Sequence, residues 1–508
     1  MAHSVATPTE APHTFRLRFS TSFSDLVCAL LFTITGFLVM GYHPGLEDDG
    51  LYLTAIKADL NPALFPRNAE FFRVQLEATQ FDRWMAAFIR LTHMPVDWAE
   101  LFWQLAALFL ILFAAKKIAN LLFAEEHARW CGVALLSGLF TLPVSGTALY
   151  MVDQHLHPRN LATAMILLAV WRMFKCRYWQ VALLLLIAFL LHPLMAAMGI
   201  SFCVFLGLAL CNWPRREWIS RGCNSLAAAA PLGWVFEPAD PSWRRALNTR
   251  RYFSIYKWTW YEWLGALAPI VFFWFLWRWS RRNGDDLLAR FSLAVFAYGV
   301  FHQALAMLLL GSPALVRAEP FQPMRYLHLF YFLFVLTCGC LLGKYALKRS
   351  AWRWVVFFFA VNAGMFAWQR AEFAASQHLE LPGRSPSNAW LQAFNWIKGQ
   401  TPQDAYFVMD AHYLEARGED YHSFRALAER SSLADAVKDA AVVTMVPELG
   451  PAWAEQVEAQ ENFNRFKIND FERLKSRYGV GWALVRLPLP EGLDCRWHND
   501  SLAVCEIP

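Results

Sequence analysis

The amino-acid sequence predicts an all-α polytopic membrane bundle of about eleven transmembrane helices, followed by a small C-terminal extracytoplasmic α/β domain. Hydrophobic residues make up 57% of the 508 residues, and charged residues make up only 17%, against about 25% in an ordinary soluble domain. Apolar runs of roughly 17 to 25 residues, the length that crosses a bilayer, follow one another along 23–369. The tail, 370–508, is polar and indicates a separate domain.

Nine apolar runs are clear, and one of them is too long for a single span. The pair His192–Pro193 divides that run into a tight hairpin of two helices, because proline restricts the preceding residue and removes a backbone donor. The runs are Phe23–Tyr42, Trp98–Ala115, Trp130–Val144, Leu161–Phe174, Tyr178–Trp213, Trp263–Trp279, Leu288–Leu310, Leu327–Leu342 and Arg353–Trp368.

Basic residues between the runs set the predicted orientation, because short cytoplasmic loops carry an excess of Lys and Arg. The basic loops all fall on one side only if a weak, Ala-rich span at Trp218–Phe236 is added, which brings the count to eleven. The N-terminus, 1–22, is then cytoplasmic. The membrane domain, 23–369, has a long outer loop at 43–97 and another at 237–261, and the tail is extracytoplasmic.

The tail carries helical and strand patterns in alternation. Strands are predicted at Ala405–Met409, Ala441–Met445 and Trp482–Val485, and helices at Ser387–Lys398 and Phe471–Tyr478. Two of the ten cysteines, Cys495 and Cys505, flank a polar turn near the C-terminus. A disulfide closing a hairpin and two unpaired thiols are equally consistent with this spacing.

The cytoplasmic loops exclude several classes of function. They are all short, and the sequence has neither GxxxxGK[ST] nor GxGxxG, so no cytoplasmic nucleotide-binding domain is expected. The net charge of +5 comes without a basic patch interleaved with aromatics, which argues against a nucleic-acid partner. Any chemistry therefore takes place in the membrane or outside it, on a substrate that arrives attached to a lipid.

Three adjacent carboxylates, Glu47, Asp48 and Asp49, follow the first span and are candidate catalytic residues. Carboxylates this close raise one another's proton affinity and attract cations. One of them is suited to act as general base on an acceptor hydroxyl or to bind a divalent metal. The alternative is an acidic N-cap and first turn for a helix starting near Leu51, which requires no chemistry.

A second polar motif, Asp153-x-His155-x-His157, precedes the fourth run. Alternating ligands on an extended segment project to one side, as metal ligands do. Because no fourth ligand is evident, a polar interfacial loop is the favoured alternative, and a divalent metal remains an optional cofactor. Arg159 follows this motif directly and is a candidate substrate-binding residue.

Four further residues are expected on the outer side, where a lipid-linked substrate would bind. His192 lies at the outer turn of the hairpin, and Arg325 at the outer end of the tenth span; Arg251 and Trp258 lie in the loop 237–261. A guanidinium can hold a phosphate bidentately, and an indole face can stack on a sugar. The alternative is snorkelling arginine and an interfacial tryptophan belt.

This arrangement resembles the GT-C glycosyltransferase superfamily, in which an N-terminal span is followed at once by a long outer loop that starts with acidic residues. More closely, the sequence is similar to a group of bacterial GT-C-like membrane proteins. The matching stretches are Asp49–Leu53, Asp59–Asn68, His192–Met195, Trp396–Ile397, Thr401–Ala405, Arg430, Lys438–Asp439 and Tyr478–Val480. Asn61, Asn68 and the run of three acids depart from the group's pattern.

The resemblance implies a multi-pass protein of the bacterial inner membrane that takes its sugar from a polyprenyl-phosphate-linked donor. Asp48 or Asp49 would be the catalytic base, and a glycan or a lipid would be the acceptor. The rival hypothesis is a non-enzymatic protein, either a transporter or flippase for lipid-linked saccharides or a scaffold for envelope assembly. Charges concentrated at the outer face, rather than at the midplane, favour the enzyme.

Overall fold

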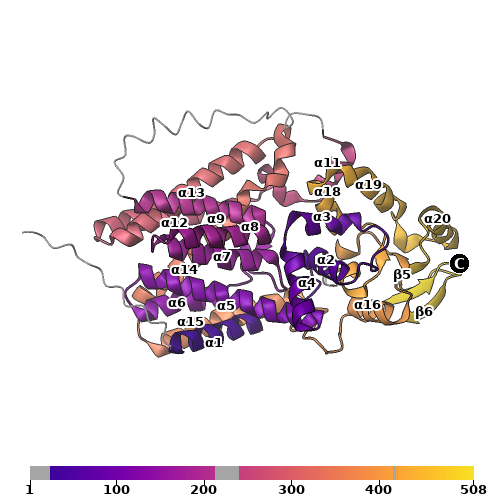
Figure 1. The fold of residues 1–508 in the computed structure, drawn as a ribbon, viewed down its shortest axis with the longest axis horizontal. Coiled ribbons are helices and arrows are strands. Elements are labelled where there is room, and N and C mark those ends of the chain that lie inside the picture. The colour runs from indigo at the N-terminus through magenta and orange to yellow at the C-terminus, as the bar shows by residue number, and fades with distance from the viewer. Residues whose placement is uncertain (1–22, 212–238, 416–418, 420–421) are drawn as a thin grey trace, which may run out of the picture.

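The computed structural model describes residues 23–211, 239–415, 419 and 422–508. Long helices form a bundle, and the tail lies against one end of it, with short helices of the loop 43–97 between them (Figure 1). The bundle helices are α1 (Phe23–Met40), α5 (Val96–Leu122), α6 (Glu126–Gly138), α7 (Pro158–Met173), α8 (Tyr178–Leu191), α9 (Pro193–Leu210), α12 (Trp260–Arg282), α13 (Asp286–Leu310), α14 (Tyr326–Leu342) and α15 (Ala351–Glu372).

Ten of the eleven predicted runs therefore form helices, and the protein is a membrane protein by the length and composition of these helices. Within the described ranges, seven are long and apolar enough to cross a membrane: Phe23–Met40, Val96–Leu122, Pro193–Leu210, Trp260–Arg282, Asp286–Leu310, Pro323–Leu347 and Ala351–Glu372. The helices α6, α7 and α8 are shorter. The weak span at Trp218–Phe236 falls outside the described residues, so the count of eleven stays a prediction.

Local sequence explains where several bundle helices begin. The predicted break at His192–Pro193 separates α8 from α9, and the His192 ring accepts the backbone N–H of Met195 at 3.4 Å. Helix α12 begins with a capping box, in which the Glu262 carboxylate accepts the Thr259 backbone N–H at 2.6 Å. These caps satisfy amide groups that have no partner within the helix.

Several segments between the long helices form short elements at the end of the bundle nearest the tail. These are α2 (Asp49–Leu60), α3 (Glu70–Ala78), α4 (Phe81–Thr92), the hairpin β1 (Pro143–Val144) and β2 (Leu149–Tyr150), α11 (Pro241–Asn248), and short turns at Arg251–Phe253, Ile255–Lys257, Pro313–Phe321 and Pro323–Arg325. Another short turn, Gly343–Leu347, follows α14 and lies beside the start of α6, where Lys344 pairs with Glu125 at 3.1 Å. Helix α2 docks on the tail, because the Lys57 ammonium binds the Glu429 carboxylate at 2.8 Å and the Ala426 carbonyl at 2.7 Å.

The tail is a five-stranded mixed sheet covered by helices on both faces. Its elements are α16 (Ala389–Gln400), β3 (Tyr406–Val408), α17 (Phe424–Ala428), β4 (Ser431–Ser432), α18 (Lys438–Met445), α19 (Gly450–Ala459), α20 (Ile468–Tyr478), β5 (Trp482–Arg486), β6 (Asp494–His498) and β7 (Leu502–Glu506). The strand order is β4-β3-β5-β7-β6. Strands β4, β3 and β5 run parallel, and β5, β7 and β6 run antiparallel.

Most tail predictions agree with these elements, and one is wrong. The stretch Ala441–Met445, predicted as a strand, belongs to helix α18. The Asp435 carboxylate accepts the backbone N–H groups of Val437 and Lys438, and this cap starts a helix that outweighs the β-branched residues. The two cysteines lie opposite each other on β6 and β7 and form a disulfide, Cys495–Cys505.

Candidate active site

A cavity of about 690 Å³ lies where the bundle meets the tail. Its walls come from segments far apart in the sequence: the first outer loop at Leu46–Asp48, the β1–β2 hairpin, the segment 153–159, the loop after α11, Arg325 before α14, and Leu414 and Val437 of the tail. Of the residues predicted from sequence, it brings together Glu47, Asp48, Asp153, His155, His157, Arg159 and Arg325.

The acidic run is split by the start of α2. Asp48 occupies the N-cap position, but its side chain makes no capping hydrogen bond and faces the cavity instead. Asp49 turns inward, is 1% exposed, and accepts the Gly45 backbone N–H at 2.6 Å. The two neighbours therefore have different roles: Asp48 faces the cavity, whereas Asp49 stabilises its own loop through the hydrogen bond from Gly45.

Cationic and polar groups surround the Asp48 carboxylate. The Lys438 ammonium lies 3.4 Å from it and 2.5 Å from the Glu47 carboxylate, and His157 Nε2 lies 3.8 Å away. Burial alone would raise the pKa of Asp48, but Lys438 and His157 hold it well below its usual range. Asp48 is therefore a carboxylate at neutral pH.

The tautomer of His157 follows from its partners. Its Nδ1 accepts the Arg159 backbone N–H at 2.9 Å, so the ring proton of the neutral form resides on Nε2, facing Asp48. Burial, with Arg159 nearby, lowers the pKa of His157 to about 4. His157 is thus a neutral ring near neutral pH whose Nε2 has no hydrogen-bond partner, and the ring stacks with that of His192 at 6.0 Å.

The predicted metal motif faces the same cavity in a different arrangement. The Asp153 carboxylate is paired with the Arg159 guanidinium, at 2.5 Å to Nη2 and 3.2 Å to Nε. Both ring nitrogens of His155 are buried without a hydrogen-bond partner. In the described ranges, the one group of three ligand atoms within 4.8 Å of one another lies elsewhere. Asp153 and Asp48 both have cationic partners here, and the metal role of this motif stays a prediction.

Two guanidinium groups face the cavity with few partners of their own. Arg159 is 2% exposed, and its Nη1 has no hydrogen-bond partner. Arg325 is 8% exposed and donates from Nε to the Gln322 side chain. Buried guanidinium donors that remain available are suited to bind phosphate oxygens.

Three predicted substrate-binding residues, His192, Arg251 and Trp258, lie outside the cavity lining. His192 stacks behind the lining residue His157. Arg251 is exposed and donates to the Lys257 carbonyl at 2.9 and 3.3 Å, whereas Arg250 lines the cavity. Trp258 is buried against the Gly146 turn of the β1–β2 hairpin, so it supports the cavity wall from behind.

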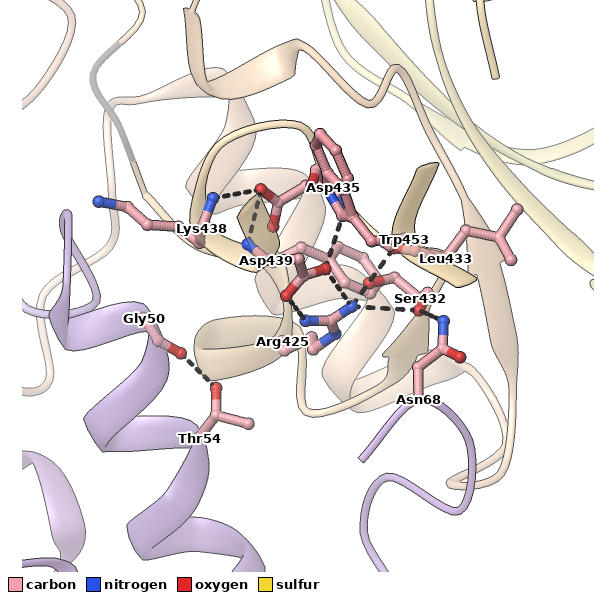
Figure 2. A network of polar contacts seen from close by, with 12 residues as sticks. Gly50, Thr54, Asn68, Arg425, Ser432, Leu433, Asp435, Lys438, Asp439 and Trp453 are labelled. Atoms are coloured by element: carbon pink, nitrogen blue, oxygen red, sulfur yellow. Dashed lines mark hydrogen bonds and ion pairs between the residues drawn. The ribbon is translucent and has the colours of Figure 1, made fainter. Parts of the chain in front are cut away.

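Lys438 was not predicted as a site residue, although it belongs to a matching stretch. It is 3% exposed at the start of α18, where Asp435 caps the helix. The adjacent Asp439 forms a bidentate ion pair with Arg425, at 2.6 and 2.8 Å (Figure 2). This buried network fixes the start of α18, which places Lys438 beside Glu47 and Asp48. A lone lysine in a polar tail gives no sequence signal for such a role.

No family model matches the sequence, and no curated protein matches it. Among solved structures, the chain is similar to a crystal structure of an Archaeoglobus fulgidus oligosaccharyltransferase in complex with Zn and sulfate, with 10% identity and a TM-score of 0.46. That match covers 91% of this chain and 67% of the other. The apo form of the same protein matches with 11% identity and a TM-score of 0.46, over 91% and 69%. A likeness this loose assigns neither fold family nor chemistry to this chain.

Proposed function

We propose that this chain is a glycosyltransferase that takes a sugar from a polyprenyl-phosphate-linked donor on the extracytoplasmic side of the membrane. One observation supports the proposal above the others. A carboxylate held in its ionised form, Asp48, and a buried guanidinium with an unused donor, Arg159, face one cavity at the end of a bundle of apolar helices. This combination suits a reaction that removes a proton on one side and releases a phosphate on the other.

The geometry suggests how the groups would divide the work. The hydroxyl oxygen of the acceptor attacks the anomeric carbon of the donor, and the bond from that carbon to the phosphate oxygen breaks. The electron pair leaves with the phosphate, which Arg159 and Arg325 hold. The hydroxyl proton moves to Asp48, a weak base that accepts it only as the O–H bond becomes acidic in the transition state.

His157 and Lys438 act in this scheme by positioning. The Lys438 ammonium, 3.4 Å from the Asp48 carboxylate, and His157 Nε2, 3.8 Å from it, supply a polar and cationic setting before substrate arrives. Preorganised charge of this kind costs no reorganisation during the reaction. The cationic charge that an optional divalent metal would otherwise supply comes from Lys438 and the two arginines.

The test is sugar transfer by the purified full-length chain in lipid nanodiscs, offered a panel of radiolabelled polyprenyl-phosphate sugars. We expect Asp48→Asn to lower turnover by about 10²-fold or more, the usual contribution of a general base. Asp59→Asn is the matched control, since this residue of the same outer loop pairs with Arg90, at 3.3 Å, near the surface.

Equal turnover in Asp48→Asn and the unsubstituted chain would remove this carboxylate from the mechanism. No turnover on any donor would favour the rival hypothesis, a transporter or scaffold for lipid-linked saccharides.

A further inference from the structure

A second cluster of ligand-type side chains lies outside the candidate active site. It consists of His43, Glu380 and His422, whose ligand atoms all lie within 4.8 Å of one another. Across 23–211, 239–415, 419 and 422–508, it is the one such group of three. None of its members lines the 690 Å³ cavity. The group therefore requires an explanation separate from the proposed transfer reaction.

The separations suit a tetrahedral ion. His43 Nδ1 lies 3.5 Å from Glu380 Oε2, and His422 Nε2 lies 2.8 Å from the same oxygen. Ligand atoms about 2.0–2.1 Å from a tetrahedral zinc lie roughly 3.3–3.4 Å from one another. The separation between the two histidine ligand atoms is also within 4.8 Å, so small side-chain rotations bring the three groups to tetrahedral spacing.

His43 is the observation that points to a missing ligand. Its side chain is fully buried, and neither ring nitrogen has a hydrogen-bond partner. The second oxygen of Glu380, Oε1, is likewise buried without one. Buried polar atoms in native proteins nearly always have a partner, and leaving one unsatisfied costs about 1–3 kcal/mol. A bound cation would satisfy the imidazole and the carboxylate together.

The three side chains offer nitrogen and oxygen ligands. Two imidazoles and a carboxylate form a ligand set that suits zinc, whereas magnesium and calcium prefer oxygen ligands alone.

Backbone pairing brings the three segments together before any ion is bound. The Tyr42 N–H donates to the His378 carbonyl at 3.0 Å, and the Glu380 N–H donates back to Tyr42 at 2.9 Å. The Ser423 N–H donates to the Gly45 carbonyl at 2.8 Å. The cluster thus lies where the start of the first outer loop meets two segments that follow the last bundle helix.

We propose that His43, Glu380 and His422 bind one Zn²⁺ ion that joins the first outer loop of the membrane domain to the tail. The fourth ligand is water, which reaches Glu380 through a neighbouring cavity of about 310 Å³ that Tyr42 and Glu380 line. The inference does not rest on the proposed glycosyl transfer, because binding and stability are its readouts.

The experiment uses the full-length chain purified in nanodiscs, loaded with Zn²⁺ and desalted. Elemental analysis should find one retained zinc per chain. A chelator should lower the temperature of unfolding, and added Zn²⁺ should restore it. Cobalt substituted for zinc should give the intense visible absorption of a tetrahedral site. Glu380→Gln, which keeps the shape of the side chain, should lose the ion, as should His43→Gln.

The matched control is His412→Gln, which removes an exposed histidine of the tail whose partner is Glu415 at 3.0 Å. It should keep the ion. A second comparison, His155→Gln, separates this site from the large cavity. Zinc that is lost from His155→Gln but kept by His43→Gln and Glu380→Gln would overturn the proposal, as would a chain that retains no zinc. Failure of sugar transfer would leave the zinc result unaffected.

Discussion

Replacing Arg425 by methionine is expected to weaken the tail more than any single surface change. Arg425 and Asp439 are 6% and 0% exposed, and their two hydrogen bonds are 2.6 and 2.8 Å long. The same guanidinium also contacts the carbonyls of Ser432 and Leu433, each at 3.4 Å (Figure 2). In Arg425→Met the buried Asp439 carboxylate has lost its cation and the two carbonyls have lost a donor.

The expected loss is about 3–5 kcal/mol of unfolding free energy, the range found when one partner of a buried ion pair is removed. That is a large part of the roughly 5–15 kcal/mol that a folded domain possesses. Limited proteolysis of the full-length chain in nanodiscs, over a denaturant series, reports tail opening directly. Arg473→Met, which breaks the exposed Arg473–Asp470 pair at 3.1 Å, is the control and should cost under about 1 kcal/mol.

The double variant Arg425→Met/Asp439→Leu distinguishes a buried charge from lost packing. Removing both charges should restore a good part of the stability, because an apolar pair of similar size avoids the desolvation cost. Recovery stays incomplete, since the Asp435 backbone N–H also donates to Asp439, at 2.9 Å. A double variant no more stable than Arg425→Met, or a single variant that loses less than about 1 kcal/mol, would refute this account.

Three further perturbations test other parts of the structure. Lys438→Met should raise the pKa of Asp48, because the attraction across 3.4 Å is about 1.2 kcal/mol, or one pKa unit, even at the dielectric constant of water. The acid limb of the pH–rate profile should therefore move to higher pH. An unmoved limb would contradict the role of Lys438. The Cys495–Cys505 disulfide closes a loop with a sequence separation of 10. Its reduction should lower the free energy of tail unfolding by about 3 kcal/mol and should make β7 more accessible to protease. Unchanged cleavage would show that the hairpin is stable without the disulfide. Gly146→Ala should destabilise the chain by about 1–3 kcal/mol in thermal unfolding, because φ of Gly146 is +66° and an added methyl would lie 2.4 Å from the Trp258 ring. A neutral result would mean that this turn can move away from the indole.

Sequence reasoning predicted the helical runs well because a membrane span is determined by neighbouring residues in the sequence. Length, hydropathy and the break at His192–Pro193 are properties of neighbouring residues, and the helices follow them. It failed at Ala441–Met445, where a cap several residues upstream decides between helix and strand. The cysteine spacing allowed two outcomes, and only the register of β6 with β7 distinguishes them.

At the candidate site, sequence reasoning identified most of the polar side chains but not their partners. Which of Asp48 and Asp49 faces the cavity depends on the residue at which α2 begins, and a run of identical acids does not specify it. Arg250 lines the cavity, whereas Arg251 starts a short turn and donates to the Lys257 carbonyl. Lys438 lies 391 residues from Glu47, so no local pattern connects the two.

That separation has a consequence for how the protein comes to be made. Synthesis proceeds from the N-terminus, so Glu47 and Asp48 leave the ribosome 391 and 390 residues before the lysine that neutralises them. A chain interrupted before Lys438 lacks the ammonium that pairs with Glu47 and Asp48, and it also lacks Val437 of the cavity wall. The cavity is thus complete only after most of the tail has been synthesised.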